Sequence, residues 1–135
     1  MASPNTKRDV SKNYSDLYNT PKEAVEALMD YCGHRFDPNK HTLFEPCNGK
    51  GNISKILEDF GIFMTTNELF TEHGDSDYNE DFLNPNKDVA NKWNFDIIIS
   101  NPPYKLATEF VTEGFKYAKE QYHLLRINFL GVQLS

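Results

Sequence analysis

The stretch that decides the fold is HTLFEPCNGKG at residues 41–51, which NISKILEDFG follows at residues 52–61. His41 to Glu45 predict a short strand, and Gly49 and Gly51 predict the sharp turn that ends it. The second stretch predicts a helix, because its apolar residues recur at helical spacing: Ile53, Ile56, Leu57 and Phe60. A strand, a glycine turn and a helix in this order open a βαβ unit.

Strand and helix patterns alternate along the rest of the chain. A near-continuous β-branched run at residues 95–100 predicts a strand buried on both faces, as in the centre of a parallel sheet. The other expected strands are residues 62–66, residues 122–129 and at most a short one at 80–83, and the other expected helices are residues 20–33 and 107–118. We therefore predict an α/β fold with a Rossmann-like, doubly wound, mostly parallel sheet of about five strands. Ligands bind such sheets at the carboxyl ends of the strands.

The first helix carries its own start and stop signals. Thr20, Pro21 and Glu23 predict a capping box, in which the Thr20 side chain bonds to a helix amide and Glu23 reaches back. Pro21 is expected at the first helical position, where no amide proton is needed. Gly33 is expected to end the helix.

Length and composition bound the organisation of the protein. Its 135 residues and 15.6 kDa suit one ordinary domain, which we place at residues 14–135 after a flexible polar arm at residues 1–13. A net charge of −6, from 14 basic and 20 acidic residues, argues against a strongly basic nucleic-acid binder and leaves room for a local basic patch.

Cysteine usage and hydropathy bear on the compartment. Cys32 and Cys47 lack the spacing of a metal site or a disulfide scaffold, so we expect reduced thiols, a cytoplasmic location and no metal. No signal-peptide pattern is present, and no stretch approaches the roughly 20 apolar residues that span a bilayer, so no membrane partner is expected.

The glycine turn is the first candidate ligand site. Glu45 and Pro46 lead into it, and Gly49 and Gly51 let the backbone turn sharply and approach a ligand closely. The amino end of the following helix attracts an anionic group. A turn that needs glycine only for its geometry explains the same residues equally well.

Two acidic positions follow the second strand and its loop. Glu68 lies where α/β nucleotide sites place an acid that accepts the ribose hydroxyls, although a solvated loop glutamate is an equal alternative. Asp81 and Phe82 have the form of an adenine clamp, with a carboxylate for the exocyclic amine and a ring for the base. Phe82 as a core residue is the alternative. The acidic run at residues 68–81 lacks metal-ligand spacing and is read as a solvated loop.

The most specific motif is Asn101-Pro102-Pro103-Tyr104, directly after the buried strand. The two prolines fix the backbone and remove amide donors, so the carbonyls and the Asn101 side-chain oxygen form a rigid cluster of acceptors. Such a cluster suits a planar NH₂ group, and the Tyr104 ring offers a stacking surface. Catalysis there would consist mostly of orientation and electrostatics.

Taken in order, these motifs resemble those of class I S-adenosylmethionine-dependent methyltransferases, and most closely the adenine-N6 DNA methyltransferases. The resemblance implies S-adenosylmethionine as cofactor, DNA adenine as substrate and Asn101 to Tyr104 as catalytic residues, with Asn101 also at the cofactor. The later run at residues 125–130 resembles the strand that follows the catalytic loop in phage and bacterial members. The implied cofactor residues are Thr20, Pro21, Glu45, Pro46, Gly49, Gly51, Glu68, Asp81 and Phe82.

Family members carry further strands and a target-recognition region, which this chain is expected to lack. We therefore expect the cofactor and catalytic part of a longer or split enzyme, with an open sheet edge that a second copy or a partner chain covers. Two alternatives stay open. The NH₂ could belong to a protein glutamine or an RNA base, or the chain could be a non-catalytic module that binds cofactor or a protein partner.

Overall fold

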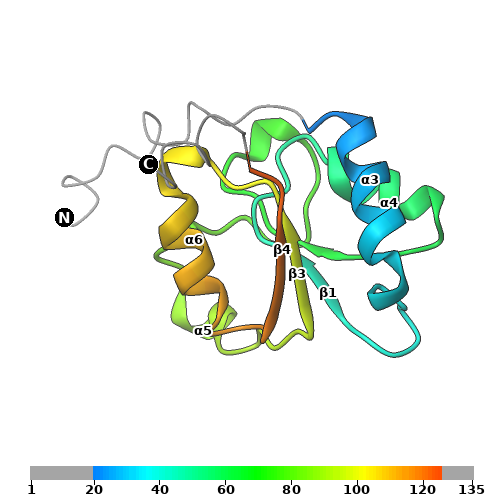
Figure 1. Cartoon of the computed structure of the whole chain (residues 1–135). Helices are drawn as coiled ribbons and strands as arrows, with labels where there is room; N and C mark the ends of the chain where they lie inside the picture. The colour runs from blue at the N-terminus through cyan, green and yellow to red at the C-terminus, as the bar shows by residue number, and fades with distance from the viewer. Residues whose placement is uncertain (1–19, 126–135) are drawn as a thin grey trace, which may run out of the picture.

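The structure, a computed structural model, describes residues 20–125 (Figure 1). Its sheet has four strands, all parallel, in the order β2-β1-β3-β4. The strands are β1 (Leu43–Glu45), β2 (Thr65–Thr66), β3 (Ile97–Ser100) and β4 (Glu120–His123). The predicted α/β, Rossmann-like parallel architecture is confirmed, with four strands among the described residues.

Helices cover both faces of the sheet, which lies between them in Figure 1. On one face lie α3 (Lys22–Cys32) and α4 (Asn52–Asp59). On the other lie α5 (Lys87–Ala90) and α6 (Ala107–Gly114). Short 3₁₀ turns are η1 (Gly33–Arg35), η2 (Thr71–His73) and η3 (Tyr104–Leu106).

The central strand β3 joins the two halves of the core. Ile97 and Ile99 pack in the cluster beneath α3 and α4, whereas Ile98 packs in the cluster on the α6 side. All three side chains are fully buried. A strand covered on both faces needs apolar residues at every position, which is why residues 95–100 read as a continuous run.

Two strand predictions need correction. Residues 80–83 form a turn, because the Asp81 side chain accepts the Leu83 amide and the Asn84 amide bonds to the Asp81 carbonyl. The single parallel bridge in this region joins Asn67 to Tyr78. The last strand begins at Glu120 and ends at His123, and the predicted continuation over residues 126–129 lies outside the described residues.

The predicted capping box at α3 is wrong. Pro21 is the N-cap residue, no side chain caps the helix, and the Thr20 hydroxyl is instead bonded to Asn101. The helix ends at Cys32 with Gly33 as its C-cap, as predicted, but Gly33 has a right-handed φ of −57° and leads into η1 without a left-handed turn. A long-range partner for Thr20 thus replaces the local one that the motif suggests.

An ion pair fastens η1 to the edge strand β4. Arg35 Nη2 and Nε donate to the two Glu120 carboxylate oxygens at 2.6 and 3.0 Å. Tyr122 also donates its hydroxyl to Glu120, and its ring packs edge-on against Phe36. Bonding to Arg35 and Tyr122 lowers the pKa of Glu120 to about 2.

We predict that Glu120→Gln lowers stability at neutral pH and that its difference from the wild type shrinks in acid. An acid with a lowered pKa contributes stability above its unfolded pKa, here 4.5, and loses it as the pH falls through its folded pKa of about 2. Denaturant midpoints of both proteins between pH 7 and pH 2 measure the effect. The exposed Glu58→Gln variant is the control, and a difference that stays constant over this range would contradict the prediction.

Candidate functional site

The candidate site lies at the carboxyl ends of β1, β2 and β3. The chain passes from β1 to β2 on one side and returns to place β3 on the other side of β1, so β1 and β3 flank the switch point of the sheet. Ligand sites of doubly wound sheets form at this point. The glycine turn follows β1, Glu68 lies just past β2, and Asn101 follows β3.

Both glycines of the turn have left-handed backbone conformations, with φ of 57° at Gly49 and 86° at Gly51. The Gly51 amide bonds to the Asn48 carbonyl at 2.8 Å, and α4 begins at the next residue. The Asn48 side chain accepts the Ser54 hydroxyl at 2.9 Å, which ties the turn to the helix. The glycines are therefore required by geometry, whatever the turn binds.

Glu45 is a buried acid at the end of β1, with 1% of its surface exposed. It accepts the Cys47 amide at 2.8 Å. Burial raises its pKa to about 8, although the bond from Cys47 opposes the shift, and the nearby Glu68 adds to the increase. Around neutral pH the Glu45 carboxyl therefore holds its proton for much of the time.

Glu68 is equally buried, and both of its oxygens are bonded to protein groups. One oxygen accepts the Gly49 amide at 2.8 Å. The other accepts the Phe70 amide at 3.0 Å and lies 3.0 Å from Nδ1 of His73. Glu68 is thus not the solvated loop residue of the alternative interpretation, and it holds the glycine turn directly.

Sequence reasoning missed Asn67, whose side chain is fully buried beside Glu68. Its amide donates to the carbonyls of Pro46 and Glu80 at 3.0 Å each and accepts the Glu80 amide at 2.9 Å. Its backbone bonds to Glu45 and Asn48. The sequence signal for Asn67 is a polar residue directly after an apolar strand, but the ligand-binding role was assigned to the neighbouring Glu68.

Asn101 is held by the residue that precedes the first helix. Its Nδ2 donates to Thr20 Oγ1 at 2.8 Å, and both side chains are buried. With Nδ2 bonded in this way, the Asn101 side chain keeps its oxygen as an acceptor. Pro102 and Pro103 are buried, and the Pro103 carbonyl accepts the Leu106 amide as η3 begins at the half-buried Tyr104.

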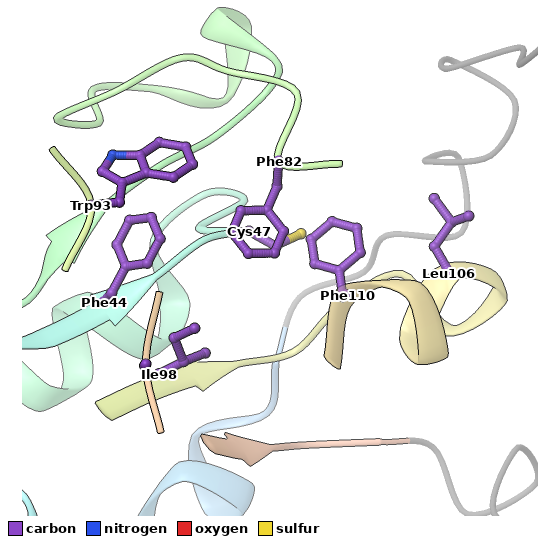
Figure 2. Close-up of a cluster of buried hydrophobic side chains, with 8 residues drawn as sticks. Phe44, Cys47, Phe82, Trp93, Ile98, Leu106 and Phe110 are labelled. Atoms are coloured by element: carbon purple, nitrogen blue, oxygen red, sulfur yellow. The ribbon is translucent and has the colours of Figure 1, made fainter. Parts of the chain in front are cut away.

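Phe82 belongs to the core, which was the alternative stated for it. Its ring is 1% exposed and lies 5.2 Å from Phe110 and 6.0 Å from Trp93, between ring centroids (Figure 2). Asp81 is half-buried and turns the chain through its bond to Leu83. The Phe82 ring therefore lies in the hydrophobic core and does not line the cavity.

A cavity of about 400 Å³ opens over the glycine turn. It brings together four of the predicted residues, which are Thr20, Glu45, Gly49 and Asn101. The others do not line it: Pro21, Pro46, Gly51, Glu68, Asp81, Phe82, Pro102, Pro103 and Tyr104. Lining residues that sequence reasoning did not select are Cys47, Asn48, Lys50, Asn52, Ile53 and His73. Its size is in the range of small-molecule sites.

A second cavity of about 470 Å³ also adjoins the glycine turn. Gly51, Lys50 and His73 line it, together with residues of α4 and of the loop before Tyr78. Asn48, Lys50 and His73 therefore border both cavities. Among residues 20–125, no helix has the length and apolar character needed to cross a membrane.

Comparison with known proteins assigns no family to this chain. No family model matches the sequence. A segment of 51 residues is 39% identical to the RNA-directed RNA polymerase of Barley stripe mosaic virus. This match covers 38% of the chain and 7% of the polymerase, so the chain spans only a small part of that relative.

We predict that Glu45→Gln removes a pH dependence of stability. An unfolded glutamate loses its proton near pH 4.5, whereas folded Glu45 keeps its proton up to about pH 8, so wild-type stability falls as the pH rises between these values. The fall is on the order of a few kcal/mol. Denaturant unfolding at pH 5, 6.5 and 8 measures it, with Glu58→Gln as a control that keeps the slope. An unchanged slope in Glu45→Gln would contradict the assignment.

We predict that Asn67→Ala lowers the unfolding free energy by about 3 kcal/mol, because this fully buried residue loses three side-chain hydrogen bonds at about 1 kcal/mol each. Chemical denaturation measures the change. The exposed Asn39→Ala is the control and should stay within about 0.5 kcal/mol of the wild type. Equal effects of the two substitutions would show that Asn67 does not hold the loops.

Proposed function

We propose that the protein transfers a methyl group from S-adenosylmethionine to the exocyclic N6 amine of adenine in DNA, as the cofactor and catalytic part of a longer or split enzyme. The observation that carries the proposal is that Asn101 and the glycine turn face one cavity, with Thr20 holding the Asn101 amide. This pairs an acceptor for a planar NH₂ with a turn suited to an amino-acid-like ligand.

The cavity fits the methionine portion of S-adenosylmethionine better than its nucleoside portion. Thr20, Glu45 and the Gly49 turn would hold the amino-acid end, because a buried carboxyl suits an ammonium group. Glu68 is within reach of the same turn, but its oxygens are bonded internally. When bound, the cofactor supplies a methyl group on a positively charged sulfur.

The chain's own residues would act by orientation and charge. Asn101 lines the cavity, and its side-chain oxygen and the Pro102 carbonyl would accept hydrogen bonds from the target NH₂. These bonds would favour a pyramidal nitrogen, whose lone pair is then available to accept the methyl group. Buried prolines hold the two acceptors in place, so the arrangement is set before the substrate arrives.

Two other functions have support from particular observations. A glutamine carboxamide or an RNA base also presents a planar NH₂, and the acceptors at Asn101 do not distinguish these groups. The internal bonds of Glu68 and the burial of Phe82 favour the second alternative, a non-catalytic module.

Calorimetric titration with S-adenosylmethionine, then labelled methyl transfer to unmethylated DNA, RNA and peptide, separates the three proposed functions. If no complete form of the protein binds S-adenosylmethionine or transfers its methyl group, the enzyme proposals are overturned.

We predict that Asn101→Ala lowers the methyl-transfer rate constant by about 10²- to 10³-fold, because an oriented acceptor at the reacting nitrogen is lost. Thr20→Val, which keeps the shape and removes the hydroxyl, should lower kcat by a smaller factor and leave the KM for DNA nearly unchanged. Steady-state kinetics measures both, with Asn39→Ala as control. A wild-type rate in Asn101→Ala, with partner binding retained, would support the non-catalytic module.

A further inference from the structure

Glu68, the acid predicted from the sequence to bind a ribose, has both carboxylate oxygens bonded to protein groups. Only 1% of the Glu68 surface is exposed. Two of its donors are backbone amides, those of Gly49 and Phe70, which are fixed by the turns they belong to. The third is the imidazole of His73, whose Nδ1 lies 3.0 Å from Oε2. His73 is therefore the one side chain among these partners.

His73 occupies the boundary between Glu68 and the space where a ligand would lie. Its side chain lines both cavities beside the glycine turn and is 23% exposed. Its ring also rests edge-on against Phe70, with centroids 5.4 Å apart. A ligand that approaches Glu68 from either cavity meets this imidazole.

The residues on both sides of His73 are exposed, and the backbone bonds of this short segment are local. Thr71, Glu72, Gly74 and Asp75 are exposed. Within residues 20–125, the backbone bonds of His73 and Gly74 are local: their amides bond to the carbonyls of Phe70 and Thr71 at 3.1 and 3.2 Å. Gly74 has φ of 119°, a conformation open to glycine. Displacement of His73 therefore breaks its bond to Glu68, its ring contact with Phe70 and the local bonds of a short turn.

We propose that His73 is a displaceable latch on Glu68, and that a ligand gains access to this carboxylate only by replacing the imidazole N–H with its own hydroxyl donors. The proposal rests on the proposed function and names a residue that selects its ligand. A ribose diol offers two O–H donors to a carboxylate and compensates for the lost bond. A ligand without these hydroxyls leaves the latch closed.

The ligand test compares His73→Ala with the wild type by calorimetry. The probes are S-adenosylhomocysteine and its 2′,3′-dideoxyribose analogue. The variant should bind the diol compound about three- to tenfold more tightly, since the net value of one hydrogen bond no longer opposes binding. Affinity for the dideoxy compound should change less than about twofold. His34→Ala, at an exposed histidine of η1, should bind like the wild type.

Weaker binding of the diol compound by His73→Ala, or an equal gain for both compounds, would overturn the latch. A ligand-free measurement separates this failure from that of the proposed function. Nitrogen-15 NMR should find the His73 Nδ1 proton protected from exchange by its bond to Glu68, and exchange as fast as at His34 would overturn the latch. Failure of every form to bind either compound would overturn the proposed function instead.

Discussion

The hydrogen bonds of the buried Asn67 side chain hold together the loops at the carboxyl end of the sheet. The side chain reaches back to the loop after β1 and forward to Glu80, so it connects segments that are far apart along the chain. Burying an amide is favourable only when its hydrogen-bonding groups are satisfied, and here the side chain makes three bonds. The position of the glycine turn relative to β2 follows from this one residue, with Glu68 adding a second attachment through the Gly49 amide.

The groups that stabilise this end of the sheet are largely the groups that a ligand would need. Glu68 holds the glycine turn, and Thr20 holds Asn101 across a separation of 81 residues. Stability and binding therefore draw on the same donors and acceptors. A ligand at the Glu68 end must exchange an internal bond for a new one, whereas Asn101 keeps an acceptor without giving up its bond to Thr20. Asn101 is therefore ready to accept a ligand in the cavity, whereas Glu68, which lies outside the lining, becomes available only after rearrangement.

The fold could be predicted from the sequence because its signals are local. The β-branched run at residues 97–99 and the glycines at 49 and 51 reflect burial and backbone geometry within a few residues. The partners within the site could not be predicted, because they join distant segments. A local motif assigned Thr20 to a helix cap, but its hydroxyl bonds to Asn101. Phe82 read equally well as ligand contact or core, and only its packing against Phe110 and Trp93 decides that the ring is buried.

Glu45 ends β1 and Glu68 lies just past the neighbouring strand β2; the two acids are equally buried, yet they differ in their relation to the cavity. Glu68 lies outside the lining, whereas Glu45 faces the cavity with a pKa raised to about 8 by burial. A cavity with a largely protonated carboxyl carries less negative charge than its sequence suggests. A cationic group brought against Glu45 stabilises the ionised form and so lowers this pKa. Binding of a cationic group at Glu45 would therefore release a proton, and its affinity would fall as the pH drops below about 8, because a larger fraction of Glu45 is then protonated.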